Sequence, residues 1–282
     1  MVVTTATSRL QAVAGHLRGE GKGQVAILTG CNSPSGIGAA TARRLAGHCR
    51  AIYVCDVHAD HLGALVRELE DGGKVAVHVR VFDAADSQAV RGVVQDAVQR
   101  YGRLDIFFAN AGIVDHALLH DLDEEEFMQT MRVNTLSVFT AIKHASHAMK
   151  ARGTGCIIAT ASVAGLRSGA GGVAYSASKA AVINLCKTSA WQLGGTGIRV
   201  NAVCPGLIQT GMTEATFELA RQRNTAHKIG QLNPLRRPGQ AEEVAAVVEF
   251  LAGEGGRYVN AQEITVDGGL SGSLPVMPGK FY

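Results

Sequence analysis

The sequence lacks the features that mark membrane-spanning and disulfide-bonded proteins. No stretch reaches the roughly 18 consecutive apolar residues that a transmembrane helix needs, and no secretory apolar segment follows Met1. The six cysteines form no Cys-x-x-Cys pair, and most stand among apolar residues, where a reduced thiol behaves as a small core side chain. We therefore expect a protein of a reducing compartment, the cytoplasm, with no membrane partner.

Aromatic residues and strong charge are also scarce. Phe, Trp and Tyr together make up 5% of the chain, and the formal net charge is only +3. Lysines and arginines form no run and no stripe with aromatic residues, so a nucleic-acid partner is not expected. Glycine, by contrast, is abundant, with 34 residues in 282. Together with 46% hydrophobic residues, it indicates a globular fold with many tight turns.

Short apolar segments rich in Val and Ile alternate with longer segments of helical pattern. Within the apolar segments polar and apolar residues do not alternate, which indicates strands buried on both faces of a parallel sheet. The alternation predicts an α/β fold, a doubly wound parallel sheet of about seven strands with helices on both faces. We predict strands at 24–29, 51–55, 74–82, 104–109, 155–160, 198–204 and 263–266, and helices at 36–47, 59–71, 87–101, 124–152, 174–193 and 241–251.

No internal repeat or change of composition divides the chain into several domains. We expect a single domain over residues 23–269, preceded by a surface arm at 1–22. A tail at 270–282, rich in Gly and Pro, is expected to pack across a neighbouring surface. The segment at about 206–239, with a short helix at 213–228, is longer than a crossover needs. Such an insertion at the carboxyl edge of a parallel sheet usually forms a lid or a binding wall.

A glycine-rich loop follows the first predicted strand and leads into a helix. Residues 29–38 read TGCNSPSGIG, with Ser35 and Ile37 beside the second and third glycines. At such a turn, backbone N–H groups and the helix N-terminus can bind a pyrophosphate. Gly30 is expected to make the turn, Gly36 to permit close approach and Gly38 to let helix and strand pack. A glycine cluster alone is more often an ordinary turn, but its place after the first strand favours a dinucleotide site.

Asp56 ends the second predicted strand. A carboxylate there can accept hydrogen bonds from the adenosine ribose hydroxyls and would repel a 2′-phosphate. No Arg or Lys lies in the glycine loop or directly after Asp56 to bind such a phosphate, so the sequence favours NAD over NADP. The ordinary structural role for this residue is to cap the helix of the segment that begins at Val57, and both roles can coexist.

Tyr175 and Lys179 stand four residues apart in a predicted helix, so both project from one face. A phenol has an ordinary pKa of about 10, too high for a base at neutral pH. An ammonium group one helical turn away favours the phenolate and lowers that pKa. Helices often carry Tyr and Lys at this spacing on a solvated face. The pair alone is therefore weak evidence for catalysis, and the other motifs are needed to interpret it.

Those other motifs follow in order along the chain. They are Thr29-Gly30 with Gly36-Ile37-Gly38, Asn110-Ala111-Gly112, Asn134, Ser162, Tyr175-x-x-x-Lys179, Pro205-Gly206 with Thr210, and Val266-Asp267-Gly268-Gly269. From about Gly23 to Gly269, the chain resembles the short-chain dehydrogenase/reductase family, whose Rossmann-type fold binds a nicotinamide dinucleotide. One departure is that five residues separate Gly30 from Gly36, where the usual loop of the family has three.

The resemblance implies a role for each motif. Tyr175 is the expected general acid or base, Lys179 lowers its pKa and binds the nicotinamide ribose, and Ser162 orients the reacting oxygen. Asn134 is expected to hold a water that relays protons from Lys179. The expected cofactor contacts are Gly30, Ser35, Gly36, Ile37, Gly38 and Asp56; Asp83 and Ala84 beside adenine; Asn110, Ala111 and Gly112 along the adenosine ribose; Tyr175 and Lys179; and Pro205, Gly206, Ile208 and Thr210 around the nicotinamide.

The remaining polar residues give weaker signals. His116/His120 and His144/His147 have spacings that can bind a metal from a helix, but neither pair has an evident carboxylate or Cys partner, and no metal is expected. For Arg167, an anionic substrate is one possible partner and solvent is the more frequent one. The residues that can reach the substrate pocket are Asp115, His116, Leu166, Arg167, Leu207, Met212 and Phe217.

These expectations add up to an enzyme. The sequence predicts an NAD-dependent oxidoreductase that interconverts a secondary alcohol and a ketone, with a homotetramer implied by the resemblance and a homodimer as the smaller possibility. The helices at 124–152 and 174–193 are expected to supply one interface. One alternative is an NADPH-dependent reductase of a 3-oxoacyl thioester or polyketide. Another, of a different class, is a non-catalytic nucleotide-sensing binding protein.

Overall fold

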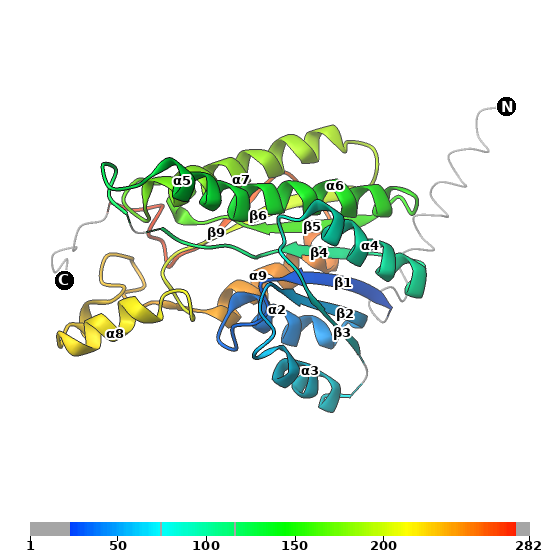
Figure 1. Ribbon diagram of the computed structural model, residues 1–282, viewed down its shortest axis with the longest axis horizontal. Helices are drawn as coiled ribbons and strands as arrows, with labels where there is room; N and C mark the ends of the chain where they lie inside the picture. The colour runs from blue at the N-terminus through cyan, green and yellow to red at the C-terminus, as the bar shows by residue number, and fades with distance from the viewer. Residues whose placement is uncertain (1–22, 74, 116, 275–282) are drawn as a thin grey trace.

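Seven parallel strands form one sheet in the computed structural model, which describes residues 23–73, 75–115 and 117–274 (Figure 1). The order across the sheet is β3-β2-β1-β4-β5-β6-β9, so the chain starts near the middle and winds outward to both edges. The strands are β1 (Gln24–Thr29), β2 (Cys49–Asp56), β3 (Ala76–Val81), β4 (Ile106–Ala109), β5 (Gly155–Thr160), β6 (Ile198–Pro205) and β9 (Glu263–Val266). The predicted doubly wound sheet is confirmed.

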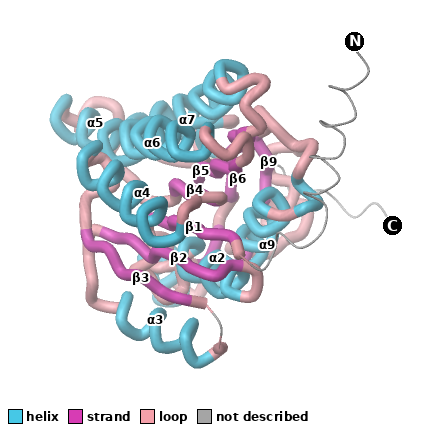
Figure 2. The backbone as a smooth tube through the Cα atoms, turned by 90° about the vertical axis from the view of Figure 1, so that its right-hand side faces the viewer, coloured by secondary structure: helices cyan, strands magenta, loops and turns pink. Residues whose placement is uncertain are grey.

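Helices cover both faces of this sheet. In Figures 1 and 2, α4, α6 and α7 lie over one face, while α2, α3 and α9 lie over the other. The helices are α2 (Ile37–Ala46), α3 (Leu62–Asp71), α4 (Ser87–Tyr101), α5 (Glu124–Met131), α6 (Ser137–Lys150), α7 (Val173–Gln192) and α9 (Ala241–Ala252). Among the helices described, none is both long enough and apolar enough to cross a bilayer.

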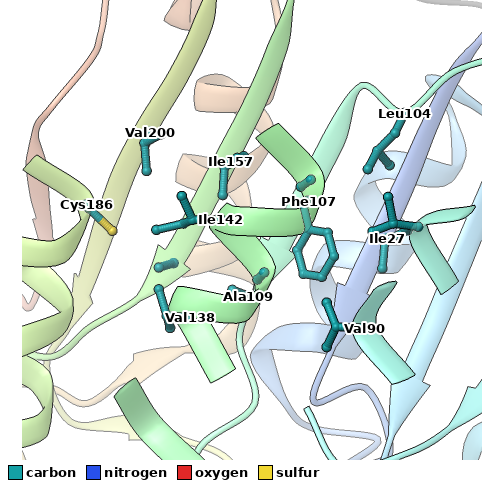
Figure 3. Close-up of a cluster of buried hydrophobic side chains, with 14 of the residues drawn as sticks. Ile27, Val90, Leu104, Phe107, Ala109, Val138, Ile142, Ile157, Cys186 and Val200 are labelled. Carbon is teal, nitrogen blue, oxygen red and sulfur yellow. The ribbon is translucent and has the colours of Figure 1, made fainter. Parts of the chain in front are cut away.

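Two hydrophobic layers hold the helices to the sheet. Figure 3 shows the first layer, in which Phe107 of β4 lies among side chains that include Val90 of α4 and Ile142 of α6. The second layer, on the opposite face, includes Leu45 of α2 and Val248 of α9. All six cysteines are unpaired and buried, as the sequence predicted. Both faces of the central strands are therefore buried, which explains why their sequences show no polar alternation.

The winding of the sheet reverses beside β1. This strand pairs with β2 on one side and with β4 on the other, with Leu28 opposite both Val54 and Phe108. Because the crossovers diverge there, the carboxyl ends of these strands border a crevice, the place where doubly wound sheets bind ligands. The glycine loop, Asp56 and the Asn110 turn all lie at this edge.

The helix predicted at 124–152 follows one continuous path, but one of its turns is not α-helical. A single π-helical turn, η1 (Arg132–Leu136), joins α5 to α6, and α6 ends at Lys150 rather than at 152. Asn134 lies at the centre of this turn and is fully buried. The hydrophobic pattern could not reveal the turn, because a π turn shifts the pattern by one residue without ending the helix.

The lid segment also differs from its prediction. Two short strands, β7 (Ile208–Gln209) and β8 (Gly239–Gln240), pair in parallel and close its base. In place of one helix at 213–228, the structure has α8 (Glu214–Gln222) and a 3₁₀ turn, η3 (Ala226–Lys228). Asn224 separates them because it adopts a left-handed backbone with φ of 52°. α8 stands apart from the sheet (Figure 1).

Other boundaries differ by a few residues. α3 begins at Leu62 instead of 59, β2 is longer than predicted at both ends, and β4 begins at Ile106 instead of 104. β3 begins at Ala76, and Lys74 lies outside the described residues, as do the predicted arm at 1–22 and the tail beyond Leu274.

Candidate active site

The glycine loop after β1 is built for close backbone approach. Gly30 has a left-handed φ of 72°, and a Cβ there would lie 2.8 Å from Nδ2 of Asn110. A Cβ on Gly38 would overlap the carbonyl oxygen of Gly30. Gly36 is the N-cap of α2 and offers the first turn no side-chain acceptor, and no acidic residue follows it there. The N–H groups of this helix end can therefore bind phosphate oxygens, and the residues present fit a dinucleotide.

The two extra residues of the loop are taken up by a local turn. The N–H of Gly36 donates to the carbonyl of Ser33 at 2.9 Å, and Nη1 of Arg43 donates to the carbonyl of Pro34 at 3.1 Å. Both bonds hold the added length at the surface, so α2 still begins directly after Gly36. The N-terminus of α2 therefore directly follows the second glycine of the loop.

Asp56 binds the glycine loop rather than a helix end. Its Oδ2 accepts from the backbone N–H of Asn32 at 2.8 Å, and its Oδ1 accepts from the N–H of His58 at 3.2 Å. The N-cap of α3 is His61, so the capping role considered for Asp56 is wrong. The carboxylate lies at the carboxyl end of β2, half-buried, where an adenosine ribose is expected.

Asn110 ties three strand ends together. Its Nδ2 donates to the carbonyls of Thr29 and Gly30, both at 3.1 Å, and its Oδ1 accepts from Oγ1 of Thr160 at 2.9 Å. These bonds place the Asn110-Ala111-Gly112 turn directly against the glycine loop. The sequence motif therefore acts as a brace between β1, β4 and β5 as well as a candidate wall for the cofactor.

Asp83 follows β3 and lies at the same edge. Its Oδ1 accepts from the N–H of Ala85 at 2.8 Å, while its Oδ2 pairs with Nη2 of Arg132 at 2.7 Å. Arg132 comes from the π turn η1, so the candidate adenine wall, Asp83 and Ala84, is joined to the helix layer. This pair could not be recognised in the sequence, because 49 positions separate its partners.

Ser162, Tyr175 and Lys179 come together beyond the carboxyl end of β5. Ser162 precedes a 3₁₀ turn, η2 (Val163–Gly165), and its Oγ accepts from the N–H of Ala164 at 3.1 Å. Tyr175 lies in the first turn of α7, where its side chain hydrogen-bonds to Ser162. Nζ of Lys179 lies 5.5 Å from the centre of the Tyr175 ring. The two side chains share one face of α7, as their spacing predicts.

The direction of the Tyr175 pKa differs from the expectation. Burial raises it above its ordinary value of 10, and the hydrogen bond from Ser162 only partly opposes this effect. Lys179 does not contribute to the shift, and its Nζ donates to the carbonyl of Thr160 at 2.8 Å. Burial in turn lowers the pKa of Lys179 to about 8. With this pKa the amine is still mostly protonated at pH 7, although it holds its proton less firmly than a hydrated lysine does.

Asn134 is bound by protein groups on almost every side. Its Nδ2 donates to the carbonyl of Ile113 and to Oγ of Ser178, both at 2.9 Å, and its Oδ1 accepts from the N–H of Ile113 at 2.8 Å. A Cβ on Gly112 would lie 3.1 Å from this Oδ1 and 3.3 Å from Nζ of Lys179. Because Gly112 has no side chain, Oδ1 of Asn134 and Nζ of Lys179 border the same small space beside its Cα.

The segment from Pro205 to Thr210 continues from β6 into the lid. Gly206 allows close packing, because a Cβ there would lie 2.8 Å from the Cα of Asp267. Ile208 is buried within the β7–β8 pair, and the N–H of Thr210 donates to Oγ1 of Thr213 at 3.1 Å. The candidate nicotinamide wall is therefore held from both the sheet and the lid.

The residues proposed for the substrate pocket separate into distinct roles. Nη1 of Arg167 donates to the carbonyls of Ser271 at 2.6 Å and Ser273 at 2.9 Å, so it binds the tail rather than an anion or solvent. Phe217 is buried within the lid segment, while Leu166 and Met212 are exposed. His116 lies outside the described residues. Asp115 accepts from the backbone N–H of Tyr175, a contact that its sequence position did not suggest.

One histidine of the second pair has an ordinary hydrogen-bond partner. Nε2 of His144 lies 2.9 Å from Oγ of Ser87. Within the ranges that the structure describes, no three His, Cys, Asp or Glu side chains gather as a metal site would require.

Comparison with known proteins agrees with this arrangement. A family model described as enoyl-(acyl carrier protein) reductase matches residues 30–271. The chain belongs to the short-chain dehydrogenase/reductase family. It is 40% identical over 250 residues to the 3-oxoacyl-(acyl-carrier-protein) reductase FabG of Thermotoga maritima, covering 88% of this chain and 98% of that protein.

Solved structures of other short-chain dehydrogenases/reductases match this chain over a similar share of its length. The crystal structure of levodione reductase superposes with a TM-score of 0.83 at 35% identity, covering 89% of this chain and 98% of that one. An actinorhodin polyketide ketoreductase crystallised with NADPH gives 0.82 at 33% identity, with the same coverage. Like its relatives, this short-chain dehydrogenase/reductase is an NAD(P)-dependent oxidoreductase that acts on CH–OH or ketone groups, which disfavours the non-catalytic alternative.

Proposed function

We propose that this protein is an NAD-dependent oxidoreductase that interconverts a secondary alcohol and a ketone, with Tyr175 as the general acid or base. The observation that carries the proposal is the convergence of Ser162, Tyr175 and Lys179 at the carboxyl edge of the sheet. The glycine loop after β1 lies at the same edge, and so does Asp56 at the end of β2. We further propose that residues 23–269 work as one catalytic unit with the segment at 206–239 as its lid.

The roles follow from the contacts of each residue. Gly30, Gly36 and Asp56 would hold the dinucleotide, with Pro205, Gly206 and Thr210 beside its nicotinamide, which supplies hydride chemistry when bound. Ser162 would hydrogen-bond the reacting oxygen and Tyr175 would exchange a proton with it. Since burial raises the pKa of Tyr175 above its ordinary value, its phenol is protonated at neutral pH, which suits ketone reduction. Lys179 and Asn134 would return the proton through a water near Gly112.

A fluorescence assay of NADH oxidation tests the reaction. Purified protein is incubated with cyclic ketones, acyclic ketones, oxidised sugars, oxidised sterols and 3-oxoacyl thioesters, and each is repeated with NADPH. We expect turnover of at least one ketone with NADH preferred. No turnover across the panel, with tight NADH binding, would refute the proposal.

The cofactor preference rests on Asp56, and Asp56→Asn is the sharpest change. The amide oxygen can still accept from the N–H of Asn32, so the loop is kept while the charge is lost. We expect kcat/KM for NADPH relative to NADH to rise about tenfold, since about 1.4 kcal/mol of repulsion corresponds to a factor of ten. Asp60→Ala, on an exposed residue nearby, should leave the ratio unchanged.

The alternative to NAD comes from the relatives, one named as a 3-oxoacyl reductase and another solved with NADPH. It predicts that the unaltered protein prefers NADPH and reduces 3-oxoacyl thioesters or polyketides. A ratio already in favour of NADPH, and unmoved by Asp56→Asn, would establish this alternative.

We also propose a homotetramer, with a homodimer as the smaller form, in which α5, α6 and α7 form one interface. A groove of about 1460 Å³ runs between these helices and includes Met128, Leu136, Phe139 and Leu185. Met128 is 61% exposed and Phe139 is 46% exposed, so apolar side chains in this groove are open to a partner. The unpaired, buried thiols suit a reducing compartment, and we place the protein in the cytoplasm.

Phe139→Asp tests this interface. We expect light scattering to give the mass of four chains, or of two, for the unaltered protein and a smaller assembly for the variant, because a buried carboxylate at an apolar contact is costly. Val98→Asp, on α4 and outside the groove, is the matched control. A monomer at micromolar concentration before any substitution would contradict the proposal.

A further inference from the structure

The helix that carries Tyr175 has no side-chain cap of its own. α7 begins after Gly172, which has no side chain to accept from the N–H groups of the first turn. The N–H of Tyr175 is one of these groups, and its acceptor comes from outside the helix. Oδ2 of Asp115 accepts from it at 2.6 Å, across 60 positions of sequence. A bond from a backbone N–H to a carboxylate is short and strong.

The other oxygen of this carboxylate is unusual. Oδ1 of Asp115 is buried and has no hydrogen-bond partner among the described residues. An unpartnered buried oxygen costs free energy, although the positive N-terminus of α7 offsets part of that cost. The stability lost at this position therefore points to a role in function.

Gly172 makes room for the carboxylate. Its φ of −62° is accessible to any residue, so backbone conformation does not require glycine there. A Cβ on Gly172, however, would overlap Oδ1 of Asp115 and lie 2.8 Å from its carbonyl oxygen. The glycine and the acid therefore form one unit, with the loop after β4 seated against the first turn of α7.

Lys179, one turn further along α7, has separate anchors. Its Nζ is bound to Thr160, and the neighbouring Ser178 is bound to Asn134. Losing Asp115 would thus leave this second turn in place and release only the turn that bears the phenol. The effect should fall on proton transfer and not on cofactor binding.

We propose that Asp115 is a positioning residue for Tyr175: by holding the first turn of α7 through the Tyr175 N–H, it sets the phenol against Ser162. The inference rests on the proposed function, in which Tyr175 exchanges the proton. Asp115 itself touches no reacting atom and acts only through Tyr175.

The test compares Asp115→Ala with Asp115→Asn. For Asp115→Ala we expect kcat for a ketone reduced in the NADH assay to fall about ten- to a hundredfold, because small misplacement of a catalytic group has effects of this size. The NADH dissociation constant should stay within about twofold, and the Tyr175 amide should exchange its hydrogen faster. Asp115→Asn should restore kcat to within about threefold, since its amide oxygen accepts the same bond.

Three comparisons decide the result. Asp86→Ala removes the cap of α4, whose carboxylate accepts from Gln88 and Ala89, and should lower thermal stability without changing kcat. Unchanged kcat in Asp115→Ala, or an Asn variant as slow as the Ala variant, would overturn the proposal. Should Asp115→Ala not fold, Gly172→Ala displaces the same carboxylate, and a folded Gly172→Ala enzyme with full turnover would also overturn it.

Failure of the proposed function would look different. If Tyr175→Phe kept its turnover, Tyr175 would not be the proton donor, whatever the Asp115 variants did. If Tyr175→Phe were inactive and Asp115→Ala fully active, only the positioning role would be lost. Hydrogen exchange at the Tyr175 amide reports on the anchor in either case, without any substrate.

Discussion

Tyr175→Phe is expected to lower kcat at least about a hundredfold while leaving NADH binding nearly unchanged. The substitution removes one hydroxyl and keeps the ring, which packs close to Gly171, where a Cβ would lie 2.6 Å from Cδ1 of Tyr175. The backbone bond to Asp115 is also kept, because it involves only the Tyr175 N–H. What disappears is the proton that the phenol delivers, together with its bond to Ser162.

Steady-state kinetics and an NADH titration measure this effect. Tyr258→Phe is the matched control, since Tyr258 is fully exposed and the same hydroxyl is removed. Turnover of Tyr175→Phe within a few-fold of the unaltered enzyme would exclude the phenol as donor and would shift attention to Ser162 or a water.

Lys179→Met is expected to abolish most turnover while costing little stability at neutral pH. Lys179 is only 3% exposed, and its pKa falls from 10.5 to about 8 on folding. A shift of this size means that folding works against the protonated amine by roughly 3 kcal/mol at pH 7. Removing the amine relieves that penalty, although it leaves the carbonyl of Thr160 without its donor, at about 1–3 kcal/mol. The two effects nearly cancel.

The pH dependence of stability identifies the cause. Because the folded pKa is lower than the unfolded one, the unfolded chain binds the extra proton between pH 8 and 10.5, and stability rises with pH in that window. Relative to Lys179→Met, the unaltered protein should therefore gain stability as pH increases from 8 to 10.5, by roughly 3 kcal/mol in total. Above 10.5 the gain is complete, and it is lost as pH falls to about 8.

Chemical denaturation at a series of pH values provides the measurement. Lys187→Met serves as control, because Lys187 lies two turns further along α7 and pairs with Glu263 at the surface. A constant difference between the unaltered protein and Lys179→Met across the window would show that the amine is not desolvated as its burial implies.

The sequence predicted the parts of this protein that depend on local pattern. The doubly wound parallel sheet follows from the alternation of strands and helices with right-handed crossovers, and the glycine loop and the Tyr175–Lys179 spacing mark one edge of that sheet. The π turn around Asn134 escaped prediction, and the side chain at its centre is bound to Ile113, 21 positions away, a contact that no local pattern encodes. The roles of Asp115 and Arg167 likewise depend on which loops meet, and no periodicity encodes that.

The electrostatics of the site were the least predictable part. Spacing on a helix indicates that two side chains share a face, and it was right for Tyr175 and Lys179. It does not indicate how dry that face is. Burial raises one pKa and lowers the other, and both shifts favour the neutral forms. The effect of a neighbouring charge can be estimated from sequence only when both groups remain hydrated.

The tie between Arg167 and the tail has an evolutionary consequence. Its two partners are main-chain carbonyls, those of Ser271 and Ser273, so the identity of those residues does not matter to the bond. The side chains at 270–274 can therefore change by substitution while the guanidinium of Arg167 keeps its hydrogen bonds to the same backbone carbonyls. Substitution of Ser271 or Ser273 should therefore leave the loop that carries Arg167, just after Ser162, tied to the same stretch of backbone.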